Sequence, residues 1–135
     1  YTSTSRDLFD LIVSNPPFYQ DHFQPDGHNN IAIHATELVQ EDLLRCVTQL
    51  LKPAGIFWVT YPRYQFDQFR NKAEGDGLFA SEKIDVFNKD ETEPFRVIGA
   101  FSRRQSEIKT SKIVIRNENN EYTESIKSLT KDYYL

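Results

Sequence analysis

The chain has 135 residues, of which 39% are hydrophobic and 13% aromatic, and its formal net charge is −4. This size and composition suit one globular core. The sequence has no apolar run of 18 residues and no signal-peptide pattern, so nothing in it supports membrane insertion or secretion, and we expect the cytoplasm as its compartment. The negative charge argues against strong nonspecific binding of nucleic acid by the chain as a whole.

The first predicted element is a short buried strand that ends in a stiff polar loop. Residues 11–13 are a continuous apolar run, typical of a parallel strand that is covered on both faces. The sequence Asn15-Pro16-Pro17-Phe18 follows one residue later. Each proline lacks an N–H donor and holds the preceding residue in extended geometry, so the strand ends here. Because ligands of open α/β sheets bind at the carboxyl ends of strands, we expect a site at this loop.

The residues of this motif suit the binding of a planar exocyclic amine. The side-chain carbonyl of Asn15 and the backbone carbonyl of Pro16 offer two acceptors to the two N–H donors of such an amine. Phe18 would stack on the base, an interaction worth about 1–3 kcal/mol. No base needs to act before attack on a sulfonium methyl group, so catalysis would depend on orientation and preorganised electrostatics. The alternative is an ordinary turn, since Asn and Pro are common in loops.

A helix is expected after a polar loop that runs to Asn30 and that serves either as a substrate lid or as a plain connection. Helical periodicity covers residues 39–51, and Pro53 and Gly55 are expected to end the helix. The single cysteine, Cys46, lies within this pattern, so we expect a buried structural thiol. The predicted inward face consists of apolar residues: Val39, Leu43, Val47, Leu50 and Leu51.

The remaining elements predict an α/β order with an antiparallel finish. They are a strand at residues 55–60, a helix at about 64–73 that ends at 75–77, strands at about 79–87, 95–102 and 112–116, and a weak helix at about 123–132. The predicted inward residues of the helix at 64–73 are Phe66, Phe69 and Ala73. The stretch 103–116 carries five cations against one acid, a local surplus of four positive charges. A basic hairpin here would contact phosphates, and the alternative is a solvated strand connection.

Two kinds of site lack support in the sequence. The histidines at positions 22, 28 and 34 are spaced by six residues, which fits neither a helical two-histidine zinc pattern nor a Cys/His finger, so we expect no metal. The five glycines, at positions 27, 55, 75, 77 and 99, do not form the glycine-rich strand-to-helix turn that cradles a nucleotide cofactor.

The motif Asn15-Pro16-Pro17-Phe18 resembles the Asn-Pro-Pro-Phe/Tyr motif of S-adenosylmethionine-dependent amino methyltransferases, which act on adenine N6, guanine N2 or the side-chain nitrogen of glutamine. Together with residues 33–38, 41–44 and 129–135, it makes nearly the whole chain resemble the bacterial tRNA1(Val) (adenine-37-N6)-methyltransferase family. The resemblance implies S-adenosylmethionine as cofactor and tRNA as partner. It implies that Asn15, Pro16 and Phe18 are catalytic and that Asn15 also contacts part of the cofactor.

The same resemblance implies the C-terminal half of a class I, Rossmann-like α/β sheet with an antiparallel terminal hairpin. We therefore expect residues 1–135 to be the catalytic and substrate-side part of one methyltransferase domain, with the N-terminal cofactor-binding half absent and the main cofactor site outside the chain. Such a fragment should be inactive alone, and the exposed edge of its first strand should favour self-association.

The expected substrate-binding residues combine the motif with the basic stretch: Pro17, Tyr19, Arg103, Arg104, Lys109 and Lys112. Two alternatives stay open at this point. The first is a methyltransferase for guanine N2 in rRNA or for a protein glutamine, which Asn15 does not distinguish because every such amine presents two donors. The second is a noncatalytic RNA-binding fragment in which the motif is only a loop.

Overall fold

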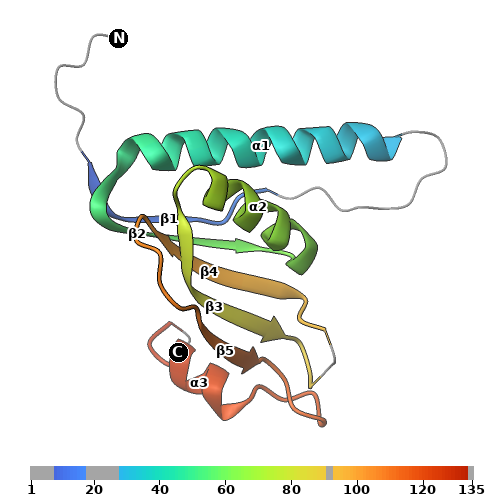
Figure 1. The fold of residues 1–135 in the computed structure, drawn as a ribbon. Helices are drawn as coiled ribbons and strands as arrows, with labels where there is room; N and C mark the ends of the chain where they lie inside the picture. Colours follow the sequence, from blue (N-terminus) through green and yellow to red (C-terminus); the bar gives the residue numbers. More distant parts are fainter. Residues whose placement is uncertain (1–7, 18–27, 91–92, 134–135) are drawn as a thin grey trace.

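Five strands and three helices make up the part of the chain that the structure describes, residues 8–17, 28–90 and 93–133 of a computed structural model (Figure 1). In chain order they are β1 (Phe9–Ser14), α1 (His28–Leu50), β2 (Leu51–Tyr61), α2 (Arg63–Gly75), β3 (Phe79–Phe87), β4 (Arg96–Ser102), β5 (Lys109–Val114) and α3 (Glu124–Thr130). No helix in these ranges is both long and apolar enough to cross a membrane.

The strands form one sheet in the order β1-β2-β4-β3-β5. The α1 crossover makes β1 and β2 parallel, whereas β4 is antiparallel to both of its neighbours. The helices α1 and α2 lie over one side of this sheet (Figure 1). The predicted parallel start and the antiparallel pairing of the later strands β3 and β4 are therefore confirmed, but the last strand, β5, pairs parallel with β3.

The basic stretch is not a hairpin, so that part of the prediction is wrong. The strand β5 pairs parallel with β3 and is not paired with β4. Since β4 already pairs with β2 on one side and β3 on the other, it has no free edge for a hairpin partner. Residues 103–108 therefore carry the chain across to the far edge of the sheet, where β5 begins at Lys109.

The helix α1 begins earlier than predicted, and its buried face matches the prediction only in part. It starts at His28, within the stretch expected to be a loop, and its buried residues are Gln40, Leu44 and Val47. The predicted face is confirmed in part, since Val47 and Leu51 are buried and Leu43 packs against the core, while Val39 and Leu50 are half-buried. The prediction missed Gln40, whose Nε2 donates to the backbone carbonyl of Gln65 at 3.0 Å. Cys46 lies on the exposed side of α1, so the expected buried thiol is wrong.

Pro53 and Gly55 lie inside β2 and do not end the helix, which already stops at Leu50. The register between β1 and β2 is interrupted here, since Phe9 pairs with Leu51 while Leu11 pairs with Ile56. The interrupted hydrogen-bond ladder between β1 and β2 tolerates Pro53, because no backbone N–H donor is needed at that position.

Aromatic rings from α2, β2 and β4 form the centre of the core. The rings of Tyr61 and Phe69 are 5.2 Å apart, and those of Phe69 and Phe101 are 5.4 Å apart in an edge-on arrangement. Phe66, Phe69 and Ala73 are fully buried, which confirms the inward face predicted for α2. This packing fixes the ends of β2 and β4 relative to each other.

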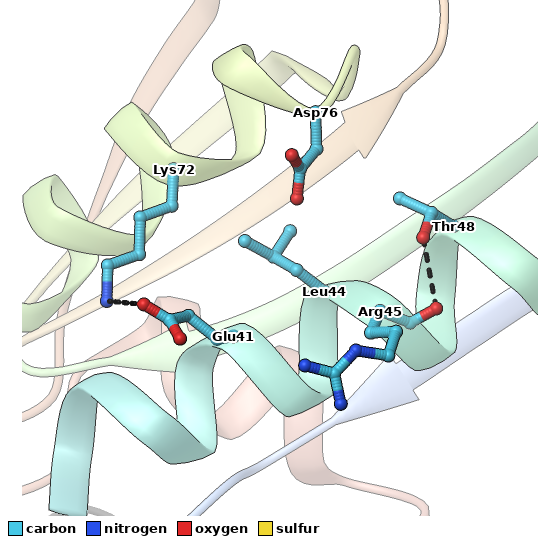
Figure 2. A pocket seen from close by; sticks show the side chains of 6 residues that line it. All are labelled: Glu41, Leu44, Arg45, Thr48, Lys72 and Asp76. Atoms are coloured by element: carbon cyan, nitrogen blue, oxygen red, sulfur yellow. Dashed lines mark hydrogen bonds and ion pairs between the residues drawn. The ribbon is translucent and has the colours of Figure 1, made fainter.

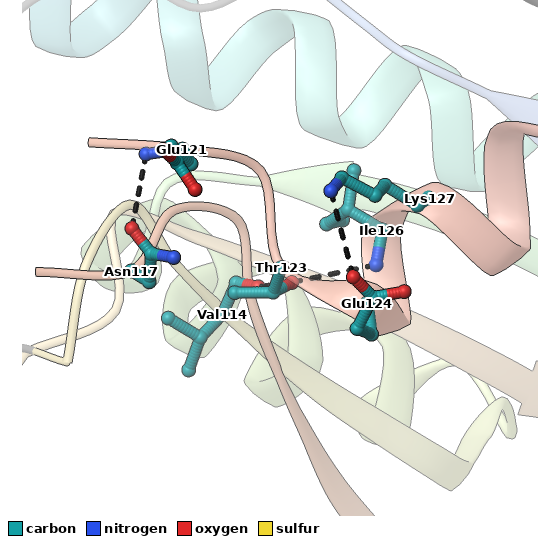
Figure 3. A network of polar contacts seen from close by, with 7 residues as sticks. All are labelled: Val114, Asn117, Glu121, Thr123, Glu124, Ile126 and Lys127. Atoms are coloured by element: carbon teal, nitrogen blue, oxygen red, sulfur yellow. Dashed lines mark hydrogen bonds and ion pairs between the residues drawn. The ribbon is translucent and has the colours of Figure 1, made fainter. Parts of the chain in front are cut away.

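The helix α3 is joined to β5 by a capping residue, as Figure 3 shows. The hydroxyl of Thr123 donates to the Val114 carbonyl at 2.6 Å and accepts from the backbone N–H of Ile126 at 3.4 Å. A threonine in this position satisfies one of the unpaired N–H groups at the start of a helix. The weak helix predicted at the end of the chain is confirmed by this element.

Gly99 supplies a test of the core. A Cβ atom at this position would lie 2.4 Å from the ring of Phe66, which is fully buried and cannot move away. Gly99→Ala should therefore lower the free energy of unfolding by about 1–3 kcal/mol, measured by urea denaturation. The matched control is Gly75→Ala at the end of α2, where nothing lies within 4 Å. Equal stability of the two variants would contradict the packing described here.

Candidate active site at one edge of the sheet

Asn15 lies at the edge of the sheet where β1 and β2 have their carboxyl ends. Ser14 pairs with Val59, so the motif begins beside the last residues of β2. Asn15 and Pro17 are exposed, whereas Pro16 is buried. The buried proline anchors the loop and leaves the amide of Asn15 in solvent. Phe18 and Tyr19 lie outside the described residues.

Arg96 reaches Asn15 from a distant part of the chain. Its Nη1 donates a hydrogen bond to Asn15 Oδ1 at 3.3 Å, across a separation of 81 residues. The contact follows from strand direction: β4 is antiparallel to β2, and Tyr61 at the carboxyl end of β2 pairs with Val97 near the amino end of β4. The first residue of β4 therefore lies at the same edge as the motif.

A cavity of about 410 Å³ is lined by residues from this edge: Arg63, Tyr64, Asp67 and Glu93. Arg63 is the first residue of α2 and forms an ion pair with Glu93. The hydrogen bond with Glu93 raises the pKa of the Arg63 guanidinium further above its ordinary value. The edge thus combines an exposed amide, two guanidinium groups and two carboxylates.

Tyr61 is excluded as an acid or base at this edge. It ends β2, but its side chain is 1% exposed and faces the core. Burial raises the pKa of the Tyr61 phenol well above its ordinary value, so the hydroxyl stays protonated. The exposed side chains described at this edge are therefore the neutral groups of Asn15 and Tyr64 and the charged groups of Arg63, Asp67 and Glu93.

Two larger cavities lie away from the motif. One, of about 600 Å³, is lined by charged residues of α1 and α2, where Glu41 and Lys72 approach to 3.9 Å (Figure 2). Its charges are balanced, since Glu41 and Asp76 face Arg45 and Lys72. The second, of about 660 Å³, lies between β5 and α3 and is mostly apolar.

The four basic residues predicted to contact RNA have different surroundings. Arg103 is half-buried, and its Nη2 donates to the backbone carbonyls of Thr48 at 2.7 Å and Leu51 at 3.0 Å. Lys112 contacts Asp90 at 3.3 Å and lies over the ring of Phe87. Arg104 and Lys109 are exposed. A role in RNA binding stays a prediction for all four.

The described residues do not form a cradle for a nucleotide cofactor. A Cβ atom at Gly55 would meet Leu51, and one at Gly99 would meet Phe66, so both glycines serve internal packing. Gly75 and Gly77 lie at the end of α2, not at a strand-to-helix turn. Within residues 8–17, 28–90 and 93–133, no group of three metal-ligating side chains occurs.

The sequence interpretation missed Arg96, Arg63 and Glu93. Arg96 is the first residue of a strand and shows no pattern of its own, and Glu93 lies in an acid-rich stretch that is typical of plain surface. A signal was nevertheless available: a strand that inserts antiparallel beside β2 must bring its first residue to the carboxyl edge of the parallel strands. Only the strand order shows that β4 is that strand.

The fold is similar to that of a larger protein of known structure. A crystal structure described as a predicted O-methyltransferase from Agrobacterium tumefaciens covers 93% of this chain and 53% of its own chain, with a TM-score of 0.64 and 13% sequence identity. At this identity the likeness concerns the fold alone. It confirms the partial Rossmann-like sheet that the sequence predicts.

Comparison of sequences gives named relatives. Proteins named tRNA1(Val) (adenine(37)-N6)-methyltransferase from Bacteroides fragilis and Trichodesmium erythraeum are each 33% identical to the chain over 100% of its length. One from Phocaeicola vulgatus is 35% identical over 98% of it. The chain spans 58%, 57% and 57% of these three proteins, a little more than half of their length. No protein-family model matches the chain. The predicted resemblance is therefore confirmed, and the chain is homologous to methyltransferases.

Variants of Arg103 and Arg104 test whether Arg103 stabilises the fold or binds RNA. Arg103→Ala removes two charge-assisted hydrogen bonds at the junction of α1 and β2, so it should lower the free energy of unfolding by about 1–2 kcal/mol. Arg104→Ala, the matched control, should change it by less than about 0.5 kcal/mol because this side chain is exposed. Thermal and urea unfolding measure both. Unchanged stability of Arg103→Ala together with weaker RNA binding would show that Arg103 acts on RNA instead.

Proposed function

We propose that the complete protein transfers a methyl group to the exocyclic N6 amine of an adenine in tRNA, and that residues 1–135 form the C-terminal part of the enzyme, which holds the target amine. The observation that carries the proposal is Asn15: its amide is exposed at the carboxyl edge of the sheet, on a loop anchored by the buried Pro16. The names of the relatives support the reaction and the substrate.

Asn15 and Pro16 would orient the amine. The two N–H groups of N6 would donate to the side-chain carbonyl of Asn15 and the backbone carbonyl of Pro16, which leaves the nitrogen lone pair directed away from both. That lone pair forms the new N–C bond, the leaving group of the donor departs with the electrons of the broken bond, and the amine loses one proton to solvent. Orientation of this kind accounts for much of the rate in reactions between two bound groups.

The methyl donor that the resemblance implies is S-adenosylmethionine. The described residues do not fit its main binding cradle, since none of their glycines opens a strand-to-helix turn. The relatives extend beyond the part that this chain matches. We therefore assign to this chain the positioning of the acceptor, and we expect no methyl transfer by residues 1–135 alone.

The substrate can be tested with the complete protein, methyl-labelled S-adenosylmethionine and a tRNA1(Val) transcript, followed by digestion to nucleosides. The expected label is in N6-methyladenosine, and a transcript with guanosine at position 37, the position in the relatives' name, should stay unlabelled. Label in N2-methylguanosine or in protein would refute the adenine assignment. No label in any substrate, with cofactor binding intact, would refute methyl transfer.

Asn15→Ala tests the site itself. Loss of the acceptor should lower kcat roughly 100-fold or more, by analogy with the removal of one preorganised hydrogen-bonding group, while cofactor affinity changes little. Asn119→Ala, at an exposed asparagine in the turn before α3, is the matched control and should retain full activity. Turnover by Asn15→Ala at the level of this control would remove Asn15 from the mechanism.

A further inference from the structure

We propose that Arg96 is a positioning residue for the target amine, because it holds the Asn15 amide in the orientation that presents Oδ1. This inference rests on the proposed function, in which Oδ1 of Asn15 accepts from the amine. The carrying observation is the hydrogen bond of 3.3 Å from Arg96 Nη1 to Asn15 Oδ1.

An asparagine amide has two ends of nearly equal size and opposite hydrogen-bonding character. Without a neighbour, Asn15 could turn either end toward the substrate, because its side chain is exposed. A guanidinium group has donors only, so it donates to the oxygen end of the amide and repels the NH₂ end. Arg96 therefore selects the orientation with Oδ1 toward the guanidinium.

The oxygen can serve two donors at once. A carbonyl oxygen has two lone pairs, so one can accept from Arg96 and the second from the amine. The opposite orientation would offer NH₂ to an amine that also has only N–H donors, and no hydrogen bond would form. A fixed orientation thus determines whether the site binds the amine productively.

Arg96 is well suited to this role because its backbone is rigid. It lies in β4, which is paired on both sides: Arg96 is opposite Val86 of β3, and the next residue, Val97, is opposite Tyr61 of β2. Val97 is fully buried. The side chain is therefore anchored at a fixed point and extends along the sheet edge to Asn15.

Strand alternation places both side chains on the same face of the sheet. In β4, Val97, Gly99 and Phe101 point toward α2, as the contact between Gly99 and Phe66 shows, so Arg96 points to the opposite face. In β1, Ile12 packs against the core beside α1, while Val13 on the other face is 70% exposed. The alternation continues to Asn15, which therefore shares the face of Arg96.

The test uses the complete protein with Arg96→Met, which keeps an unbranched apolar stem but removes every donor, and Arg96→Lys, which restores a group with donors only. Arg96→Met should lower kcat about 10- to 100-fold, with the KM for tRNA and cofactor affinity little changed. Arg96→Lys should recover part of the loss. Arg45→Ala, an exposed arginine of α1 that pairs with Asp42, is the control and should have normal kcat.

The double variant Asn15→Ala/Arg96→Met distinguishes a positioning role from a structural or RNA-binding role. If Arg96 acts through Asn15, this double variant should be as slow as Asn15→Ala alone, within about twofold. Losses that multiply would overturn the inference. A higher KM for tRNA and a weaker salt dependence of Arg96→Met at normal kcat would also overturn it, because they indicate that Arg96 contacts a phosphate. A faster Arg96→Met enzyme would overturn it as well, because it indicates that Arg96 competes with the amine for Asn15. A normal Asn15→Ala enzyme would instead refute the proposed site.

Discussion

The insertion of β4 between β2 and β3, antiparallel to both, is the constraint on which the site depends. Parallel strands bring only their carboxyl ends to one edge, so β1 and β2 alone would place loop residues there. The reversed direction of β4 adds the amino end of a central strand, and with it Arg96, to the same edge. A residue 81 positions from Asn15 thereby becomes its hydrogen-bonding partner.

The aromatic core gives this edge its rigidity. Tyr61, Phe69 and Phe101 connect the end of β2, the middle of α2 and the end of β4 through ring contacts at 5.2 and 5.4 Å. Close packing of this kind permits few alternative positions for the strands. The exposed polar groups of the site therefore project from a packed part of the sheet, which does not need to rearrange when a substrate binds.

The positive charges of the chain have separate roles. Arg103 joins the end of α1 to β2, and Arg63 pairs with Glu93 at the start of α2. Arg96 contacts the amide that would hold the substrate. The number of cations in residues 103–116 therefore overstates how many can bind a phosphate, since Arg103 already donates to backbone carbonyls.

The sequence by itself determined the local features: the strand before Asn15, the inward face of α2 at Phe66, and the homology to methyltransferases. These depend on residue type and short-range periodicity, which a linear sequence contains. Tertiary structure alone decided that Gln40 is buried, that the basic stretch crosses to β5, and that Arg96 meets Asn15. The burial of Gln40 depends on how α1 packs against α2, where it donates to the backbone of Gln65. The other two features depend on which strands become neighbours, and that choice reflects burial summed over the whole sheet.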